Sequence, residues 1–198
     1  MLLAPTYPVA TARLDLRPLQ LADVDALLTY RSRADVCRYV PFEPQDRETL
    51  ETYVTTVWSR HSIDDEGQNL NLGVLERASG ELVGDVMLRW YSKEHLGGEI
   101  GYVFHPDVAG RGFATEAMHA VVHLAFDDLE LHRLIARVDA RNAASSAVCG
   151  RLAMRREAHL LQNEWFKGEW TDEIDYGLLR DEWDARVVRP GECPRCAG

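Results

Sequence analysis

Three residues in the middle of the chain, Gly110-Arg111-Gly112, form a turn whose chemistry suits phosphate binding. An apolar stretch ends at Phe104 before the turn, and a helix opening with Ala114-Thr115-Glu116 follows it. Glycine permits the positive φ angles that let several backbone N–H groups point the same way. The helix dipole adds about half a positive charge at the same place. The spacing therefore predicts a site for an anionic ligand, and a polyphosphate fits it best.

Two familiar phosphate-binding patterns do not fit this turn. A P-loop requires Lys and then Ser or Thr directly after its second glycine, where this chain has Phe113 and Ala114. A dinucleotide fingerprint requires a third glycine, where this chain has Thr115, and it usually lies in the first βα unit of a domain. A glycine turn that only caps a helix, with no ligand, remains an alternative.

The segment Ala109-Gly110-Arg111-Gly112-Phe113-Ala114 resembles the diphosphate loop of the GNAT N-acetyltransferase superfamily, Gln/Arg-x-x-Gly-x-Gly/Ala. Its first position is Ala109, so one side-chain contact of the family is absent and the backbone must form the cradle. Three more segments resemble, in the same order, the branch that includes ribosomal-protein N-terminal acetyltransferases. They are the first strand at 11–19, an N-x-x-S element at Asn142–Ser145, and a Gly-x-Trp-x-Asp turn with an apolar strand within 167–183.

This resemblance implies a fold and a donor. The implied fold is α/β, with a mixed, largely antiparallel sheet, a splayed bulged strand and helices on both faces. The implied donor is acetyl-CoA, with no metal. Its pantetheine arm would pair with the backbone of Tyr102, Val103 and Phe104, and Asn142 would bond its amides or simply cap the following helix. Its pyrophosphate would lie over the backbone of Gly110, Arg111, Gly112, Phe113, Ala114 and Thr115.

The resemblance also implies how the leaving thiolate is protonated. The superfamily at large uses a tyrosine seven residues after the Asn position, and this chain has Cys149 there. In the branch that this chain resembles, the serine of N-x-x-S takes that role, so Ser145 is the candidate acid. Its alternative role is a first-turn hydroxyl that satisfies a backbone group. Cys149 is most simply a buried small apolar residue.

A general base must accept the proton of the attacking amine. Glu99 begins the strand before the glycine turn, where the superfamily often carries a carboxylate, and partial burial would tune it. A solvent-exposed glutamate on an edge strand is the competing interpretation. Glu164, Asp172 and His95 are other candidates, and water alone could also take the proton.

Hydrophobic periodicity supplies the elements that must position these groups. Strands are predicted at 12–18, 69–76, 82–91, 98–104, 133–139, 154–164 and 172–179. Helices are predicted at 21–32, 46–61, 114–127, 143–152 and 181–187. Strands joined by crossover helices indicate an α/β sheet that is partly antiparallel and has helices on both faces.

Length and composition bound the remaining possibilities. The 198 residues suit a single domain at 1–188, followed by a tail at 189–198 that is predicted to be disordered. Cys193 and Cys196 lie in that tail without a second ligand pair, so no zinc site is predicted. The 32 acidic and 22 basic residues give a net charge of −10, which disfavours nucleic acid and membrane partners. No apolar run reaches transmembrane length and no basic signal-peptide region is present, so we expect a cytoplasmic protein.

We therefore expect an N-acetyltransferase that moves an acetyl group from acetyl-CoA to a primary amine by direct attack. The acceptor is either a protein N-terminus or a small amine, and a homodimer stays open. A non-catalytic acyl-CoA sensor or scaffold would keep the cradle while Ser145 and Glu99 were dispensable. A nucleotide-binding turn outside this superfamily would bind NAD or ATP in preference to CoA.

Overall fold

The computed structural model describes residues 1–187 and contains one eight-stranded sheet. The strand order is β1-β2-β3-β4-β5-β6-β8-β7, and every neighbouring pair is antiparallel except the parallel pair β5–β6. The strands are β1 Val9–Ala10, β2 Leu14–Pro18, β3 Asn69–Glu76, β4 Leu82–Ser92, β5 Gly97–Phe104, β6 Arg133–Asp139, β7 Arg155–Phe166 and β8 Glu169–Leu179. The predicted mixed, largely antiparallel sheet is confirmed.

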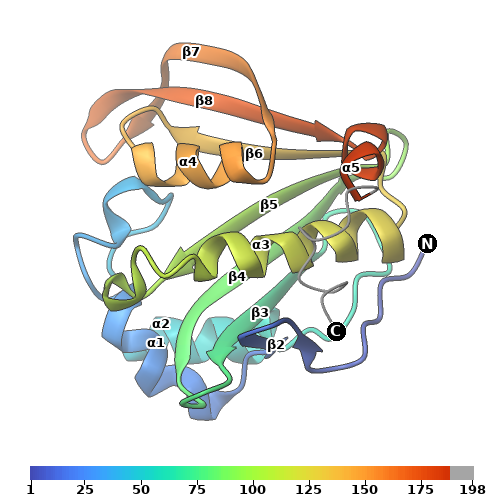
Figure 1. Ribbon diagram of the computed structural model, residues 1–198. Coiled ribbons are helices and arrows are strands. Elements are labelled where there is room, and N and C mark those ends of the chain that lie inside the picture. Colours follow the sequence, from blue (N-terminus) through green and yellow to red (C-terminus); the bar gives the residue numbers. More distant parts are fainter. Residues whose placement is uncertain (188–198) are drawn as a thin grey trace.

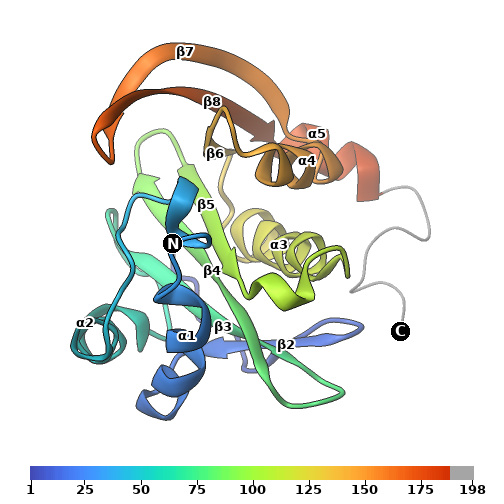
Figure 2. The same ribbon diagram turned by 90° about the vertical axis from the view of Figure 1, so that its left-hand side faces the viewer.

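Helices cover both faces of this sheet. Figure 2 shows α1 and α2 on one side of β3 and β4, with α3 on the other side. The helices are α1 Val24–Arg31, α2 Arg47–Tyr53, α3 Phe113–His123, α4 Ala143–Arg151 and α5 Arg180–Val187. In the described part of the chain, no helix is both long and apolar enough to cross a membrane.

The alternating sequence of β3 explains why two separate cores form. Leu70, Leu72 and Val74 point to one face, where they join the larger core with residues of α3. Gly73 points to the other face, where an added Cβ would meet Leu19 of the smaller core. That smaller core lies under α1 and α2. Burying a leucine side chain in either core stabilises the fold by about 1.5–3 kcal/mol.

The splayed strand is β5, and the gap that it opens matters for function. Its parallel register with β6 covers only Gly97–Glu99, which pair with Arg133–Ile135. Within the described residues, Ile100–Phe104 have no registered partner on β6, while they stay paired with β4. The bulge of the β4–β5 pair lies at the end of β4, between Trp90 and Ser92. Figure 1 shows β5 and β6 diverging from the end near α5.

Most predicted elements are present, with differences at their ends. The helix predicted at 46–61 is shorter, because α2 passes into a π-helical turn at Val54–Trp58. The helix predicted at 114–127 likewise ends in a π-helical turn at Leu124–Asp128. The last two strands are longer than predicted and form a hairpin that turns at Lys167 and Gly168. The tail predicted at 189–198, with Cys193 and Cys196, lies outside the described residues.

Candidate active site

The glycine turn has the geometry that its sequence predicts. Gly110 has a φ of +79° and Gly112 a φ of +80°, the left-handed region that glycine adopts without strain. Gly112 is the N-cap of α3, so the first N–H groups of that helix are free of intrahelical partners. An added Cβ at Gly110 would meet no atom within 4 Å. This open, N–H-lined surface fits the diphosphate of acetyl-CoA.

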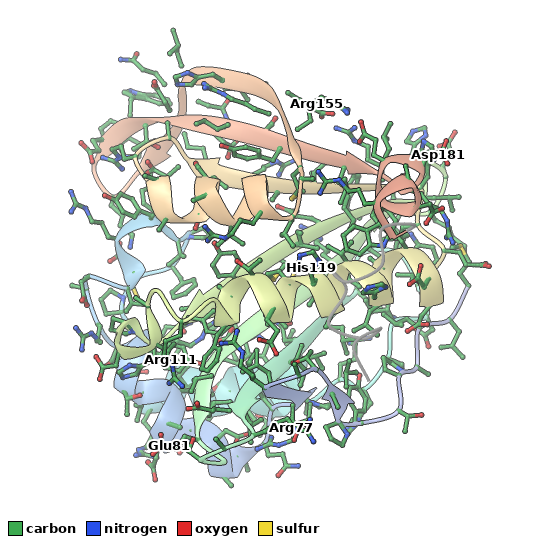
Figure 3. The ribbon with its side chains drawn as sticks, in the orientation of Figure 1. Arg77, Glu81, Arg111, His119, Arg155 and Asp181 are labelled. Carbon is green, nitrogen blue, oxygen red and sulfur yellow. The ribbon has the colours of Figure 1, made fainter. Side chains whose placement is uncertain are left out.

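Side chains from distant parts of the chain hold the turn in place. Arg13 donates from Nη1 to the backbone oxygen of Arg111 at 2.9 Å and pairs with the buried Glu116 of α3. Arg111 pairs with Glu76, and its guanidinium lies 4.3 Å from the ring centre of Phe113. Arg111 lies at the N-terminal end of α3 (Figure 3). These contacts fix the backbone conformation of the turn from two sides.

A further cation stands beside the turn. Arg151, at the end of α4, donates from Nε to the hydroxyl of Thr115 at 2.9 Å. The position suits a phosphate contact, since a guanidinium is a strong phosphate donor. Sequence reasoning missed both Arg13 and Arg151, because only the packing of α3 against β2 and α4 brings them here.

The predicted acid, Ser145, contacts β5 directly. Tyr102 donates its hydroxyl hydrogen to Ser145 Oγ at 3.0 Å. Asn142 caps α4 by accepting the Ser145 backbone N–H at 3.1 Å, so the capping role of Asn142 is confirmed. Burial raises the pKa of Tyr102 to about 12, so the phenol stays protonated and keeps donating. The Ser145 hydrogen is then free to point elsewhere.

Cys149 follows Ser145 by one turn of α4 and lies in the core. Its side chain is buried, with only 3% of the residue exposed. Burial raises the pKa of this thiol to about 11, so it is neutral at physiological pH. The interpretation of Cys149 as a small apolar residue is supported.

One cavity of about 550 Å³ extends from Ser145 and Cys149 to the other face of the sheet. Its floor includes Met87 and Gly101 on the α1–α2 side, and it reaches Met118, Ser145 and Cys149 on the α3–α4 side. It therefore passes through the gap between β5 and β6. Of the predicted cofactor residues, the lining includes Tyr102, Val103, Asn142 and Ser145, whereas Phe104 and the glycine turn lie outside it.

Carboxylates are concentrated in this lining. Six are present, against three guanidinium groups from Arg31, Arg89 and Arg137. Three of the sequence-based candidates for the base are among them, and His95 is not a lining residue. The six carboxylates belong to Asp85, Glu99, Asp139, Glu164, Asp172 and Glu173.

The carboxylates differ in their surroundings. Glu99 is not a solvent-exposed edge residue, since β5 is internal and only 19% of its side chain is exposed, with Arg137 at 4.0 Å. The Gln162 backbone N–H and the His159 ring hold the pKa of Asp172 below its usual value. Burial and the nearby carboxylates of Glu164 and Asp175 raise the pKa of Glu173. Sequence reasoning missed Glu173, whose environment depends on the pairing of β8 with β6.

A buried ion pair forms a fixed wall of the cavity. Arg31, which is 4% exposed, pairs with Asp85 at 2.5 Å, and Tyr30 donates to the same carboxylate at 2.8 Å. The Arg31 guanidinium lies between the rings of Phe42 and Trp58, at 4.8 and 4.5 Å from their centres. These charges cancel each other, and Arg141 pairs with the lining residue Asp139 in the same way, at 2.7 Å. The unpaired surplus in the lining therefore consists of Glu99, Glu164, Asp172 and Glu173 against Arg89 and Arg137.

Comparison with known proteins identifies the class. The family model "Acetyltransferase (GNAT) domain" matches residues 13–155. An N-acetyltransferase of Bacillus subtilis, YnaD, whose function is uncharacterized, is 30% identical over 89% of this chain and 99% of its own length. A crystal structure of a GNAT-family acetyltransferase from Bacillus anthracis has a TM-score of 0.79 and 30% identity, covering 87% of this chain and 98% of that chain. Spermidine N-acetyltransferase from Vibrio cholerae, solved with CoA and spermine, has a TM-score of 0.74 and 21% identity, covering 87% of this chain and 98% of that chain.

The chain belongs to the GNAT acetyltransferase family, as its motifs predicted. It is an N-acetyltransferase, and the family's reaction moves an acetyl group from acetyl-CoA to an amine. The glycine turn and the edge of β5 that has no registered partner on β6 both fit this donor.

Proposed function

We propose that this N-acetyltransferase acts on a small cationic primary amine. The observation that carries the proposal is the charge of the cavity lining. When the Arg31–Asp85 and Arg141–Asp139 pairs are set aside, four carboxylates remain against the two guanidinium groups of Arg89 and Arg137. Such a lining raises the local concentration of a cation. The Vibrio cholerae relative, solved with spermine, supports the same class of acceptor.

The mouth of the cavity favours a small acceptor over a protein N-terminus. Lys167, at the tip of the β7–β8 hairpin, donates from Nζ to the backbone oxygens of Cys37 at 2.5 Å and Phe42 at 2.9 Å. These bonds tie the hairpin to the segment before α2 beside the cavity, which Phe42 and Phe166 line. A folded protein would have to displace this contact, whereas a small amine would not.

In the proposed mechanism, the donor supplies an activated acetyl thioester beside the gap between β5 and β6. Backbone N–H groups of Gly112–Thr115 hold its diphosphate, and the free edge of Tyr102–Phe104 pairs with its pantetheine arm. Glu99 accepts a proton from the ammonium group, directly or through water, and passes it to solvent, so that the neutral amine attacks the thioester carbonyl. Ser145 donates its hydroxyl hydrogen to the leaving thiolate and recovers a proton through solvent from the nitrogen of the tetrahedral intermediate. The hydrogen bond from Tyr102 stabilises the negative charge that develops on Ser145 Oγ as its proton leaves.

The test is release of free thiol from acetyl-CoA across a panel of acceptors. The panel contains linear diamines, amino alcohols, aminoglycosides and peptides with free N-termini. We expect release with the small cationic amines and little with the peptides. Release with peptides alone would assign a protein acceptor, and acetyl-CoA binding without release over the whole panel would favour the sensor.

A further inference from the structure

A single carboxamide in the cavity lacks the partners that buried polar groups normally have. Asn71, on β3, lines the cavity and is only 7% exposed. Its Oδ1 is buried and accepts no hydrogen bond from any described residue. Leaving such an atom unpaired destabilises the folded protein, so a ligand group that donates to it would restore the missing hydrogen bond.

A second asparagine of β3 has the same unpaired oxygen but lies outside the cavity. Asn69 lies two residues earlier, on the same face of β3, and its Oδ1 also lacks a partner among the described residues. Asn69 does not line the cavity, whereas Asn71 does. Of these two asparagines, Asn71 is therefore the one that a ligand in the cavity can contact.

The strand register fixes how far Asn71 lies from the reacting atoms. Asn71 pairs with Met87 of β4, and Met87 pairs with Gly101 of β5. Gly101 precedes Tyr102, whose hydroxyl contacts Ser145. Two strand spacings of about 4.8 Å place Asn71 about 10 Å from the backbone beside which the acceptor amine must react.

The surface between Asn71 and the backbone of Gly101 is apolar. The Met87 side chain extends toward Gly101, since its Cε lies 3.4 Å from where a Cβ of Gly101 would be. The rings of Tyr53 and Trp58, which are stacked with centres 5.0 Å apart, also line the cavity. A hydrocarbon chain of about eight bonds would span this distance.

We propose that Asn71 binds a second polar group of the acceptor, about eight bonds from the amine that is acetylated. The proposal rests on the acceptor class given above and narrows it to linear amines that carry a distal hydroxyl or amino group. The distal group donates a hydrogen bond to Asn71 Oδ1, because the surplus of carboxylates in the lining favours donors over acceptors. Asn71 is thus a specificity-determining residue of the acceptor site.

The test compares two probes of equal length, an eight-carbon amino alcohol and the eight-carbon alkylamine without the hydroxyl. Calorimetry measures their binding to the CoA-loaded protein, so the result does not depend on turnover. Because the hydroxyl is uncharged, the carboxylates of the lining do not attract it as they would an ammonium group. A preference for the amino alcohol therefore reports the hydrogen bond to Asn71. We expect the wild-type protein to prefer the amino alcohol about tenfold.

Substitution of Asn71 should remove this preference. We expect Asn71→Leu to bind both probes equally or to favour the alkylamine, while the matched variant Asn69→Leu keeps the wild-type preference. Asn71→Ala, compared with Asn69→Ala, repeats the experiment if the larger side chain disturbs folding. A wild-type protein without preference, or an Asn71 variant that retains it, would overturn the proposal.

Thiol release measured on the same proteins separates this proposal from the proposed function. Release from acetyl-CoA with both probes at equal efficiency and equal affinity would support a small-amine acceptor and refute the role of Asn71. Selective binding of the amino alcohol without release would support Asn71 as a ligand-binding residue and refute the proposed acceptor.

Discussion

The two halves of the active-site region are built in different ways. In the proposed site, the cofactor half consists of backbone N–H groups at Gly112–Thr115 and the edge of β5 that has no registered partner on β6, and distant residues such as Arg13 hold that backbone in place. The acceptor half is a cavity lined by side chains from β3, β4, β5, β6, β8 and the segment before α2. On this proposal, backbone chemistry recognises a group common to every acyl-CoA, whereas side chains set the choice of amine.

This difference predicts which substitutions affect which substrate. Changes at the glycine turn should alter donor affinity and leave acceptor preference intact. Changes in the cavity should do the reverse. Ser145 lies between the two halves and should affect turnover more than the binding of either substrate.

The largest effect is expected from Gly112→Glu. The substitution places a Cβ at a φ of +80° and puts a carboxylate beside the diphosphate. We expect the affinity for acetyl-CoA to fall several hundredfold, a loss of about 3–4 kcal/mol. Isothermal titration calorimetry measures it.

Gly67→Glu is the matched control for that variant. Gly67 has a φ of +83° in the loop before β3, and an added Cβ there meets nothing within 4 Å. It therefore carries the same backbone strain, and its N–H donates to the backbone oxygen of Trp90, near the end of β4, and not to a residue that holds the glycine turn. Acetyl-CoA binding that weakens equally in both variants would contradict the cradle.

Ser145→Ala should lower kcat about hundredfold and leave the KM for acetyl-CoA nearly unchanged, since general acid catalysis contributes at least that much. Ser146→Ala is the control, because Ser146 is adjacent on α4 and does not line the cavity. Steady-state kinetics separates the two constants. Wild-type turnover in Ser145→Ala would transfer the proton donation to water.

Glu173 should give acceptor binding a pH dependence. Its pKa lies above the usual value for glutamate, so its negative charge is lost as the pH falls through that raised pKa. We expect the acceptor KM to rise about fivefold over that interval in the wild-type enzyme. Glu173→Gln should remove this rise, and a profile that stays the same in the variant would exclude Glu173 from acceptor binding.

The smallest effect is expected from Lys167→Met, which loses the two bonds that tie the hairpin to Cys37 and Phe42. We expect about a threefold rise in the acceptor KM and no change in the KM for acetyl-CoA. Faster reaction of peptides in this variant would show that the hairpin restricts the size of the acceptor. An unchanged acceptor profile would mean that the contact has no part in selection.

The sequence predicted the glycine turn and the helix starts well because their signals are local. The spacing Gly110-Arg111-Gly112 specifies a turn and a helix start within six residues, and the capping of α4 by Asn142 is equally local. The order of strands and helices follows from hydrophobic periodicity in the same way. Periodicity does not fix element ends, so the π-helical turns after α2 and α3 were not predicted.

The acceptor half could not be predicted because it depends on long-range pairing. The alternation in β3 places Asn69 and Asn71 on one face, but only the register with β4 and β5 shows that Asn71 lines a cavity. The Arg31–Asp85 pair and the environment of Glu173 likewise join residues far apart in sequence. The assignment of Glu99 as base, the cytoplasmic location and the homodimer stay predictions.

The most direct test of the central claim uses a conjugate in which the sulfur of CoA is linked to the nitrogen of the eight-carbon amino alcohol. Calorimetry compares this conjugate with CoA itself. The account predicts that the conjugate binds more tightly than CoA. Gly112→Glu should weaken the binding of both ligands, whereas Asn71→Leu should remove only the extra affinity of the conjugate. A conjugate that binds no better than CoA, or a gain that survives in Asn71→Leu, would contradict a site divided in this way.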